Sequence, residues 1–120
     1  MKSGRIMIID SDVEFLEELE HFFILEGWAV AALTSGHEAV RTALSEKPDV
    51  ILLELSEGPG GGVSAAEKLK DAAGTSDIPV IYLTGYYSVL NENPDERICL
   101  KRHFNPERVV EEVKRILDEL

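Results

Sequence analysis

The amino-acid sequence predicts an α/β domain built on a doubly wound parallel sheet. Short apolar runs without polar alternation, such as RIMIID (5–10) and DVILLEL (49–55), are typical of strands that are buried on both faces. Longer amphipathic segments separate these runs, and the connections are short enough for right-handed crossovers. Helices are therefore expected to cover both faces of the sheet.

The expected elements alternate along most of the chain. Strands are predicted at residues 5–10, 28–33, 49–55, 78–85 and 97–101, and helices within residues 11–27, 35–47, 62–74 and 105–120. Residues 86–96 contain Pro94 and two asparagines, which favours a shortened or irregular fourth helix. The prediction is a five-stranded (βα)5 arrangement in one domain that spans residues 1–120.

Local patterns mark the helix ends. Three Ser-x-x-Glu patterns predict capping boxes: Ser11 with Glu14, Ser35 with Glu38, and Ser64 with Glu67. Asn105 followed by Pro106 predicts the start of the last helix. Gly27 predicts the end of the first helix.

The composition and net charge of the chain exclude some classes of function. The 120 residues carry 12 Lys and Arg against 23 Asp and Glu, a net charge of −11. Such a surface repels nucleic-acid phosphates and anionic lipid, so we expect no direct nucleic-acid or membrane binding. No apolar run reaches the roughly 18 residues of a membrane span. The single cysteine, Cys99, has no partner for an internal disulfide. These features favour a cytoplasmic location.

Polar side chains follow the predicted strands directly. In open α/β sheets, the chemistry lies at the carboxyl ends of the strands, near the point where strand order reverses. The residues found there are Asp10, Ser11, Asp12, Glu54, Thr84, Lys101, Arg102 and His103. The acidic pocket is expected to comprise Asp10, Ser11 and Asp12, with Glu54 next to it at the end of the third strand.

Five segments in register resemble the receiver domain of two-component response regulators over almost the whole chain. They are IIDSDVEFLEELEHFFILEGW, SGHEAV, PDVILLEL, IPVIYLTG and NPERVVEEVKRIL. The resemblance implies a flavodoxin-like fold. It also implies an acidic pair that binds Mg²⁺ after the first strand, an aspartate that accepts a phosphoryl group after the third, and a hydroxyl and a lysine that contact the phosphoryl oxygens. Asp10 matches the first acid, and Thr84 matches the hydroxyl.

The other positions depart from the pattern that the resemblance implies. Ser11 stands in place of the second acid, and Mg²⁺ requires anionic oxygen in near-ideal octahedral geometry. Mg²⁺ binding is therefore expected to be weakened or lost, with weak binding at Asp10 the remaining option and Asp12 a less suitable substitute. Gly62 lies eight residues after Glu54, at the family's usual glycine position.

Glu54 stands at the phosphoacceptor position of the pattern. Its additional methylene shifts the carboxylate oxygens, and a misplacement of about 1 Å costs on the order of 100-fold in rate. Three roles stay open: Glu54 is phosphorylated, it permanently imitates a phosphorylated aspartate by meeting a cation, or it only binds local backbone amides. Either Lys101 or Arg102 replaces the family lysine, and Arg102 would suit a pair with Glu54.

Cys99 falls where the family has a rotating aromatic residue, and its small side chain favours a buried hydrophobic role. The whole pattern predicts a degenerate receiver: a signalling and protein-interaction module rather than an enzyme, without a catalytic residue or a required cofactor. Its partners would be proteins, such as a histidine kinase, an output domain or a second copy in a homodimer. The alternatives are an atypically phosphorylated response regulator and a flavodoxin-like domain that binds a small ligand.

Overall fold

A computed structural model of the chain describes residues 3–56, 58–84, 99–101 and 105–119. The elements of these residues are β1 (Arg5–Ile9), α1 (Val13–Leu25), β2 (Ala29–Leu33), α2 (Ala39–Glu46), β3 (Val50–Glu54), α3 (Gly62–Asp71), β4 (Val80–Thr84), β5 (Cys99–Lys101) and α5 (Pro106–Asp118). Each lies within a segment for which the sequence predicts the same type of element. Residues 86–96 lie outside the described residues, so the predicted fourth helix and the count of five strand–helix units stay predictions.

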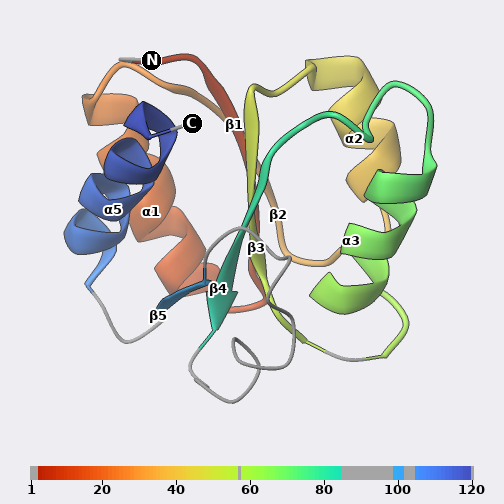
Figure 1. The fold of residues 1–120 in the computed structure, drawn as a ribbon. Coiled ribbons are helices and arrows are strands. Elements are labelled where there is room, and N and C mark those ends of the chain that lie inside the picture. The colour runs from red at the N-terminus through yellow and green to blue at the C-terminus, as the bar shows by residue number, and fades with distance from the viewer. Residues whose placement is uncertain (1–2, 57, 85–98, 102–104, 120) are drawn as a thin grey trace.

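The sheet is parallel throughout, in the order β2-β1-β3-β4-β5 (Figure 1). The chain thus has a flavodoxin-like α/β fold. Strand order reverses after β2, because the chain then passes to the other side of β1 to form β3. As a result β1 and β3 lie side by side, with Ile9 paired to Leu53. At the other pairs of strand ends, Glu54 lies opposite Leu83 and Thr84 opposite Lys101. The carboxyl ends of the strands therefore meet at one edge of the sheet.

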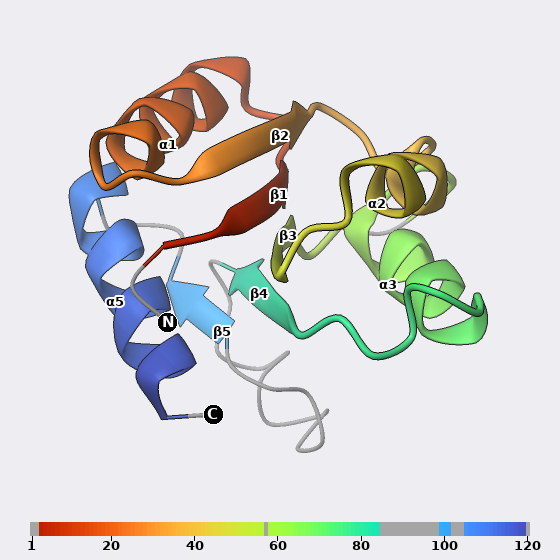
Figure 2. The same ribbon diagram turned by 90° about the horizontal axis from the view of Figure 1, so that it is seen from above.

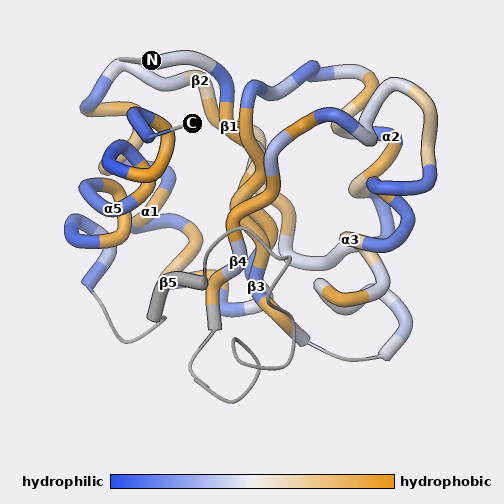
Figure 3. The backbone as a smooth tube through the Cα atoms, viewed as in Figure 1, coloured by the Kyte–Doolittle hydropathy of each residue, from blue (hydrophilic) through white to orange (hydrophobic). Residues whose placement is uncertain are grey.

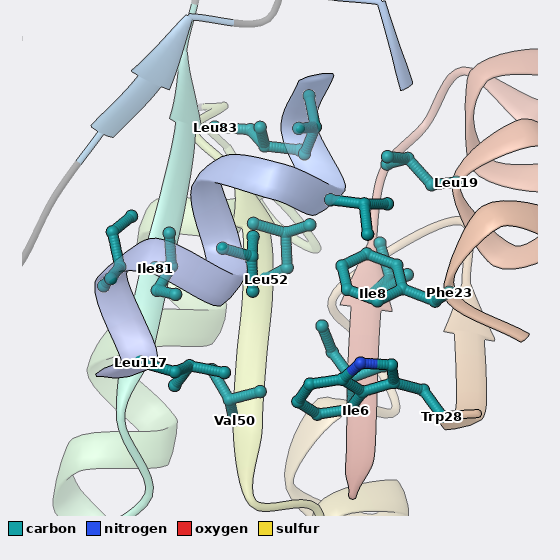
Figure 4. Packing of buried hydrophobic residues seen from close by; sticks show 14 of the residues in the cluster. Ile6, Ile8, Leu19, Phe23, Trp28, Val50, Leu52, Ile81, Leu83 and Leu117 are labelled. Atoms are coloured by element: carbon teal, nitrogen blue, oxygen red, sulfur yellow. The ribbon is translucent and has the colours of Figure 1, made fainter. Parts of the chain in front are cut away.

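Two helical layers enclose the sheet. Figures 1 and 2 show α1 and α5 on one face, and α2 and α3 on the other. Alternate strand residues serve the two layers: Ile8 and Leu52 pack with α1 and α5 (Figure 4), whereas Met7 and Ile51 pack with α2 and α3. Apolar residues accordingly run along β1, β2, β3 and β4 in Figure 3, as the unalternated strands of the sequence predict.

The start of α5 confirms its prediction, whereas the three predicted capping boxes are wrong. Asn105 caps α5 by accepting a hydrogen bond from the Arg108 amide at 2.8 Å. The other helices begin elsewhere: α1 is capped by Asp12, α2 begins after Glu38 without a side-chain cap, and α3 begins at Gly62 with Ser64 already inside it. A Ser-x-x-Glu pattern predicts a cap from local sequence alone, but α1 is capped by the next residue, Asp12, and the start of α3 is held by Ser56 in the preceding connection.

The start of α3 depends on a close approach between Gly62 and β3. A Cβ atom at Gly62 would lie 1.7 Å from the carbonyl oxygen of Glu54, which is far inside van der Waals contact. The amide of Gly62 donates to the Ser56 hydroxyl at 3.0 Å, and the Val63 amide donates to the Ser56 carbonyl at 3.0 Å. Only glycine fits at this position, which explains in physical terms why a glycine follows Glu54 at this spacing.

We expect Gly62→Ala to lower the free energy of unfolding by about 1–3 kcal/mol, because the new methyl group must push α3 away from β3. Urea unfolding followed by the fluorescence of the single, buried Trp28 measures the effect. Gly58→Ala is the control, since a Cβ there meets no atom within 4 Å and strains only a backbone with φ of +88°. An equal or smaller loss in Gly62→Ala than in Gly58→Ala would contradict the steric argument.

The exposed face of α5 carries its own ion-pair network. Glu112 lies 3.5 Å from Arg108 Nε and accepts a hydrogen bond from Arg115 Nε at 3.0 Å, and Arg115 also lies 3.4 Å from Glu119. The hydrogen bond from Arg115 is the main reason that the pKa of Glu112 is held below its ordinary value. The charges of this face are thus largely compensated within the helix.

Replacement of Arg115 by glutamine should raise the pKa of Glu112 toward its ordinary value of 4.5. A carboxyl group whose folded-state pKa is lowered stabilises the fold above its unfolded pKa, and this stability is lost as the pH falls through the folded value. The destabilisation by Arg115→Gln should therefore be larger at pH 7 than at pH 3. Carboxyl titration by NMR and urea unfolding at both pH values test this. Arg41→Gln, which breaks an exposed pair with Glu38, should leave Glu112 unchanged.

Candidate functional site

The candidate site lies at the carboxyl edge of β1 and β3, the two strands at the centre of the strand-order reversal. Asp10 directly follows β1, and Glu54 is the last residue of β3. Because Ile9 pairs with Leu53, these two acidic positions are neighbours across the sheet. The strand register thus places Asp10 of the predicted acidic pocket next to Glu54.

Asp10 is fully buried and organises the turn from β1 into α1. Its amide donates to the carbonyl of Leu33 at 3.0 Å, so the backbone of residue 10 extends the β1–β2 pairing. Its Oδ1 atom accepts a hydrogen bond from the amide of Asp12 at 2.8 Å. This Asx-type contact reverses the chain toward the helix. The Leu33 carbonyl was not among the predicted site residues, since no side-chain pattern marks it.

Asp12 begins α1. Its Oδ1 atom accepts a hydrogen bond from the Phe15 amide at 3.2 Å, which satisfies one of the free amides of the first helical turn. The sequence assigned this role to Ser11, paired with Glu14. Asp12 takes the cap because the contact between Asp10 and the Asp12 amide places residue 12 at the last non-helical position.

Ser11 instead binds Glu54. The Ser11 hydroxyl donates to Glu54 Oε1 at 2.9 Å, and the Ser11 amide donates to the same oxygen at 3.1 Å. The Glu54 residue is only 8% exposed, so its carboxylate depends on such donors. The two hydrogen bonds tie the start of the β1–α1 connection to the end of β3. Of the three roles predicted for Glu54, this contact resembles the binding of local donors.

The connection after β3 is held at both ends. The Leu55 amide donates to the Leu83 carbonyl at 2.8 Å, and Ser56 binds the first two residues of α3 as described above. Gly60 accepts a hydrogen bond from the Gly36 amide at 2.8 Å, which joins this connection to the one after β2. Ser56 therefore positions the backbone around Glu54, and no motif in the sequence identified it.

The remaining predicted site residues are placed only in part. The backbone register puts Thr84 and Lys101 opposite each other at the ends of β4 and β5, on the same edge as Glu54, and puts Cys99 opposite Tyr82. Arg102 and His103 lie outside the described residues, so the choice between Lys101 and Arg102 and the pairing of Arg102 with Glu54 stay predictions.

The carboxylates around Glu54 each accept hydrogen bonds from nearby residues of the chain. Asp10 Oδ1 and Asp12 Oδ1 accept backbone hydrogen bonds, and Glu54 Oε1 accepts two from Ser11. Among the residues that the structure describes, no group of three or more His, Cys, Asp or Glu side chains is arranged as a metal site.

Comparison with known proteins identifies the family. Residues 6–113 match the family described as the response regulator receiver domain. The chain belongs to this family. Receiver domains are signalling modules rather than enzymes, so the acidic edge lies in a signalling domain. None of the helices in the described part of the chain is long and apolar enough to cross a membrane.

Individual relatives agree with this assignment. The receiver domain is 36% identical over 97 residues to the transcriptional regulatory protein PrrA of Mycobacterium tuberculosis, covering 81% of this chain and 39% of that protein. It is 34% identical over 81 residues to the protein PilH of Pseudomonas aeruginosa, covering 68% and 67% of the two chains. The crystal structure of a response regulator from Desulfuromonas acetoxidans superposes with a TM-score of 0.85 at 26% identity, covering 98% of both chains.

The contact between Ser11 and Glu54 can be measured by a double-mutant cycle. We expect Ser11→Ala to lower the free energy of unfolding by about 1–2 kcal/mol, because a hydrogen bond to a carboxylate is lost. The effect should largely disappear in the background of Glu54→Met, which has no side-chain oxygen to accept the hydrogen bond, and the cycle should then give a coupling free energy of about 1 kcal/mol. Ser45→Ala, at an exposed position in α2, serves as the control. Independent, additive effects of the two substitutions would contradict the contact.

Proposed function

We propose that this receiver domain is a degenerate one, a protein-interaction module that is not controlled by the usual Mg²⁺-dependent phosphorylation of an aspartate. In this proposal Glu54 occupies the phosphoacceptor position and Ser11 occupies the position of the second metal-binding acid. The observation that carries the proposal is the pair of hydrogen bonds from Ser11 to Glu54 Oε1, at 2.9 and 3.1 Å.

The chemistry of phosphoryl transfer supports this interpretation. A carboxylate nucleophile must present an oxygen to the donor, and the metal must neutralise the charge that develops on the phosphoryl group. Glu54 Oε1 is engaged by Ser11, and Ser11 offers a neutral hydroxyl in place of an anionic ligand. Asp12, the other acid near the pocket, caps α1 with its carboxylate. Mg²⁺ binding would therefore be weak, with Asp10 the main remaining ligand.

A structural role for Glu54 follows from the same contact. In the family pattern, a metal ion would lie between the acids after the first strand and the aspartate after the third. Here the Ser11 hydroxyl and amide link these two strand ends directly. We infer that the link holds the carboxyl edge in one arrangement without a metal ion. The domain would then present a constant surface to its partners.

The proposed partners are proteins: a histidine kinase, an output domain or a second copy of the chain in a homodimer. The chain spans 39% of the length of PrrA, whose name describes a transcriptional regulator, so an attached output domain is part of this proposal. The net charge of −11 argues against direct contact of this domain with nucleic acid or an anionic membrane. A cytoplasmic location agrees with these partners.

Phosphorylation can be tested by incubating the protein with Mg²⁺ and acetyl phosphate and weighing it by intact-protein mass spectrometry. We expect no stoichiometric gain of a phosphoryl group by the wild type. The double variant Ser11→Asp/Glu54→Asp restores the acid pair and the shorter nucleophile, and it should gain the group when Mg²⁺ is present. A stoichiometric gain by the wild type that Glu54→Gln abolishes would overturn the proposal and favour an atypically phosphorylated response regulator.

A further inference from the structure

β2 forms one edge of the sheet, and its outer side carries backbone groups that meet no other strand of the described chain. Successive strand residues direct their N–H and C=O groups alternately to the two sides of the strand. The amide of Ala29 and the carbonyl of Leu33 form hydrogen bonds on the β1 side, at 2.9 and 3.0 Å, so Ala31 between them faces β1 as well. Val30 and Ala32 therefore point outward, and within the described part of the chain their backbone groups form no hydrogen bond there.

The edge is open and lacks the features that usually block strand addition. The residues of β2 are exposed or half-buried, whereas every residue of β3 is buried. A hollow of about 120 Å³ lies beside the first half of β2, and its lining includes Ala29, Val30, Ala31, Glu46 and Pro48. Natural sheet edges are commonly protected by charges, prolines or bulges, but β2 contains no charged residue and no proline, and its register with β1 is unbroken. The backbone of β2 is thus available to a further strand.

One side of α1 borders this edge. Val13, Glu20 and Ile24 lie seven and four residues apart, which places them on the same side of the helix. This side faces away from α5, because Glu18 on the opposite side shares the lining of a hollow with residues 105–107. Figure 2 shows α1 over β2, with α5 further along the sheet toward β5. Val13 and Ile24 are 53% and 54% exposed, so the edge is bordered by two apolar side chains with an acidic one between them.

The charge beside the edge favours a basic partner over a second copy of the chain. Glu20 is half-buried and forms no ion pair within the described residues. If β2 paired with β2 of a second copy across a two-fold axis perpendicular to the sheet, both α1 helices would lie on the same face and bring the two Glu20 side chains toward each other. Each copy also carries a net charge of −11. Because like charges at an interface are costly, a strand that carries a cation suits this edge better.

We propose that the outer edge of β2 binds an extended segment of a partner protein as an added strand. The backbone of this segment exchanges hydrogen bonds with Val30 and Ala32. Its side chains on the α1 face are apolar with a central lysine or arginine opposite Glu20, and its side chains on the other face are small enough for the hollow beside Glu46. The proposal rests on the proposed function as a protein-interaction module and adds the chemistry of the partner segment.

A designed peptide tests the proposal directly. The probe is a fluorescein-labelled peptide of about eight residues, long enough to cover β2, with valine, lysine and valine on one face and threonine on the other. Two backbone controls carry N-methyl groups on alternate amides, one set on each edge of the extended peptide. An added strand loses its affinity with one set and keeps it with the other, because only one edge of the peptide faces β2. A third control carries glutamate in place of lysine, and binding is measured by fluorescence anisotropy.

Hydrogen exchange of the protein amides, followed by NMR, locates the bound peptide. The amides of Val30 and Ala32 should exchange at least about tenfold more slowly in the complex, because they become hydrogen-bonded. The amide of Ala31 already faces β1 in the free protein, so its exchange should change by less than about twofold. Ala31 therefore serves as a control within the same strand.

Two matched pairs of variants test the side-chain contacts. Glu20→Lys should weaken binding about tenfold, which corresponds to about 1.4 kcal/mol. Glu18→Lys makes the same change of charge on the other side of α1 and should weaken binding by less than about threefold. Ile24→Ser should weaken binding about fivefold, whereas Leu25→Ser, at a 67% exposed position on the side of Glu18, should have little effect. Circular dichroism and urea unfolding establish that all four variants are folded.

Support for the proposal consists of affinity lost with one N-methylated set only, new protection of Val30 and Ala32, and weaker binding by the Glu20 and Ile24 variants. Absence of binding at peptide concentrations up to about 1 mM would overturn it, as would equal loss with both N-methylated sets, equal binding of the glutamate peptide, or protection centred on another strand. Dimerisation of the free protein that protects the same two amides, detected by sedimentation velocity, would also overturn it and would assign the edge to a second copy of the chain.

The test is independent of the chemistry at Glu54. Glu54→Gln should bind the probe as the wild type does, because residue 54 lies in β3 and away from the outer edge of β2. Phosphorylation of Glu54 would therefore contradict the proposed function without affecting this test. Failure of the peptide to bind would contradict only the added strand.

Discussion

The two hydrogen bonds that Ser11 donates to Glu54 connect the carboxyl ends of β1 and β3, which are neighbouring strands at the centre of the sheet. A carboxylate that is 8% exposed is costly unless it has donors, and the Ser11 amide and hydroxyl supply them. The same contact draws Ser11 out of the helix start. Asp12 then caps α1, and Asp10 holds the Asp12 amide. The local structure from residue 10 to residue 15 therefore depends on the contact between Ser11 and Glu54.

The backbone around Glu54 is constrained from the opposite direction by α3. Gly62 brings the first turn of this helix against the Glu54 carbonyl, and Ser56 accepts the hydrogen bond of the Gly62 amide. The side chain of Glu54 is thus fixed by the β1–α1 connection, whereas its main chain is fixed by the β3–α3 connection. Two loops that are far apart in the sequence thus determine the position of one carboxylate.

The distribution of charge separates the helical layer of α1 and α5 into two kinds of surface. Along the outer side of α5, arginines lie three and four residues from glutamates and compensate them. Lys114 also bridges to Glu26 at the end of α1, at 3.3 Å. On α1, by contrast, Glu14, Glu17 and Glu18 form no ion pair within the described part of the chain. Dissolved salt limits the reach of such uncompensated charges to about 10 Å.

The sequence by itself determined the strands, the parallel sheet and the edge at which the polar residues collect. This was possible because a strand buried on both faces must be apolar throughout, and because polar residues that end such strands have only one edge to occupy. The Asn105–Pro106 start of α5 was equally predictable, since the cap and the first turn are contiguous in the chain. What the tertiary structure decided was every contact between distant segments. The Ser-x-x-Glu pattern predicts a local capping role for Ser11, but in the structure Ser11 binds a buried carboxylate 43 residues away. The hollow lined by Glu14, Phe22 and Pro106 likewise requires α1 and α5 to pack together, because its walls come from both helices.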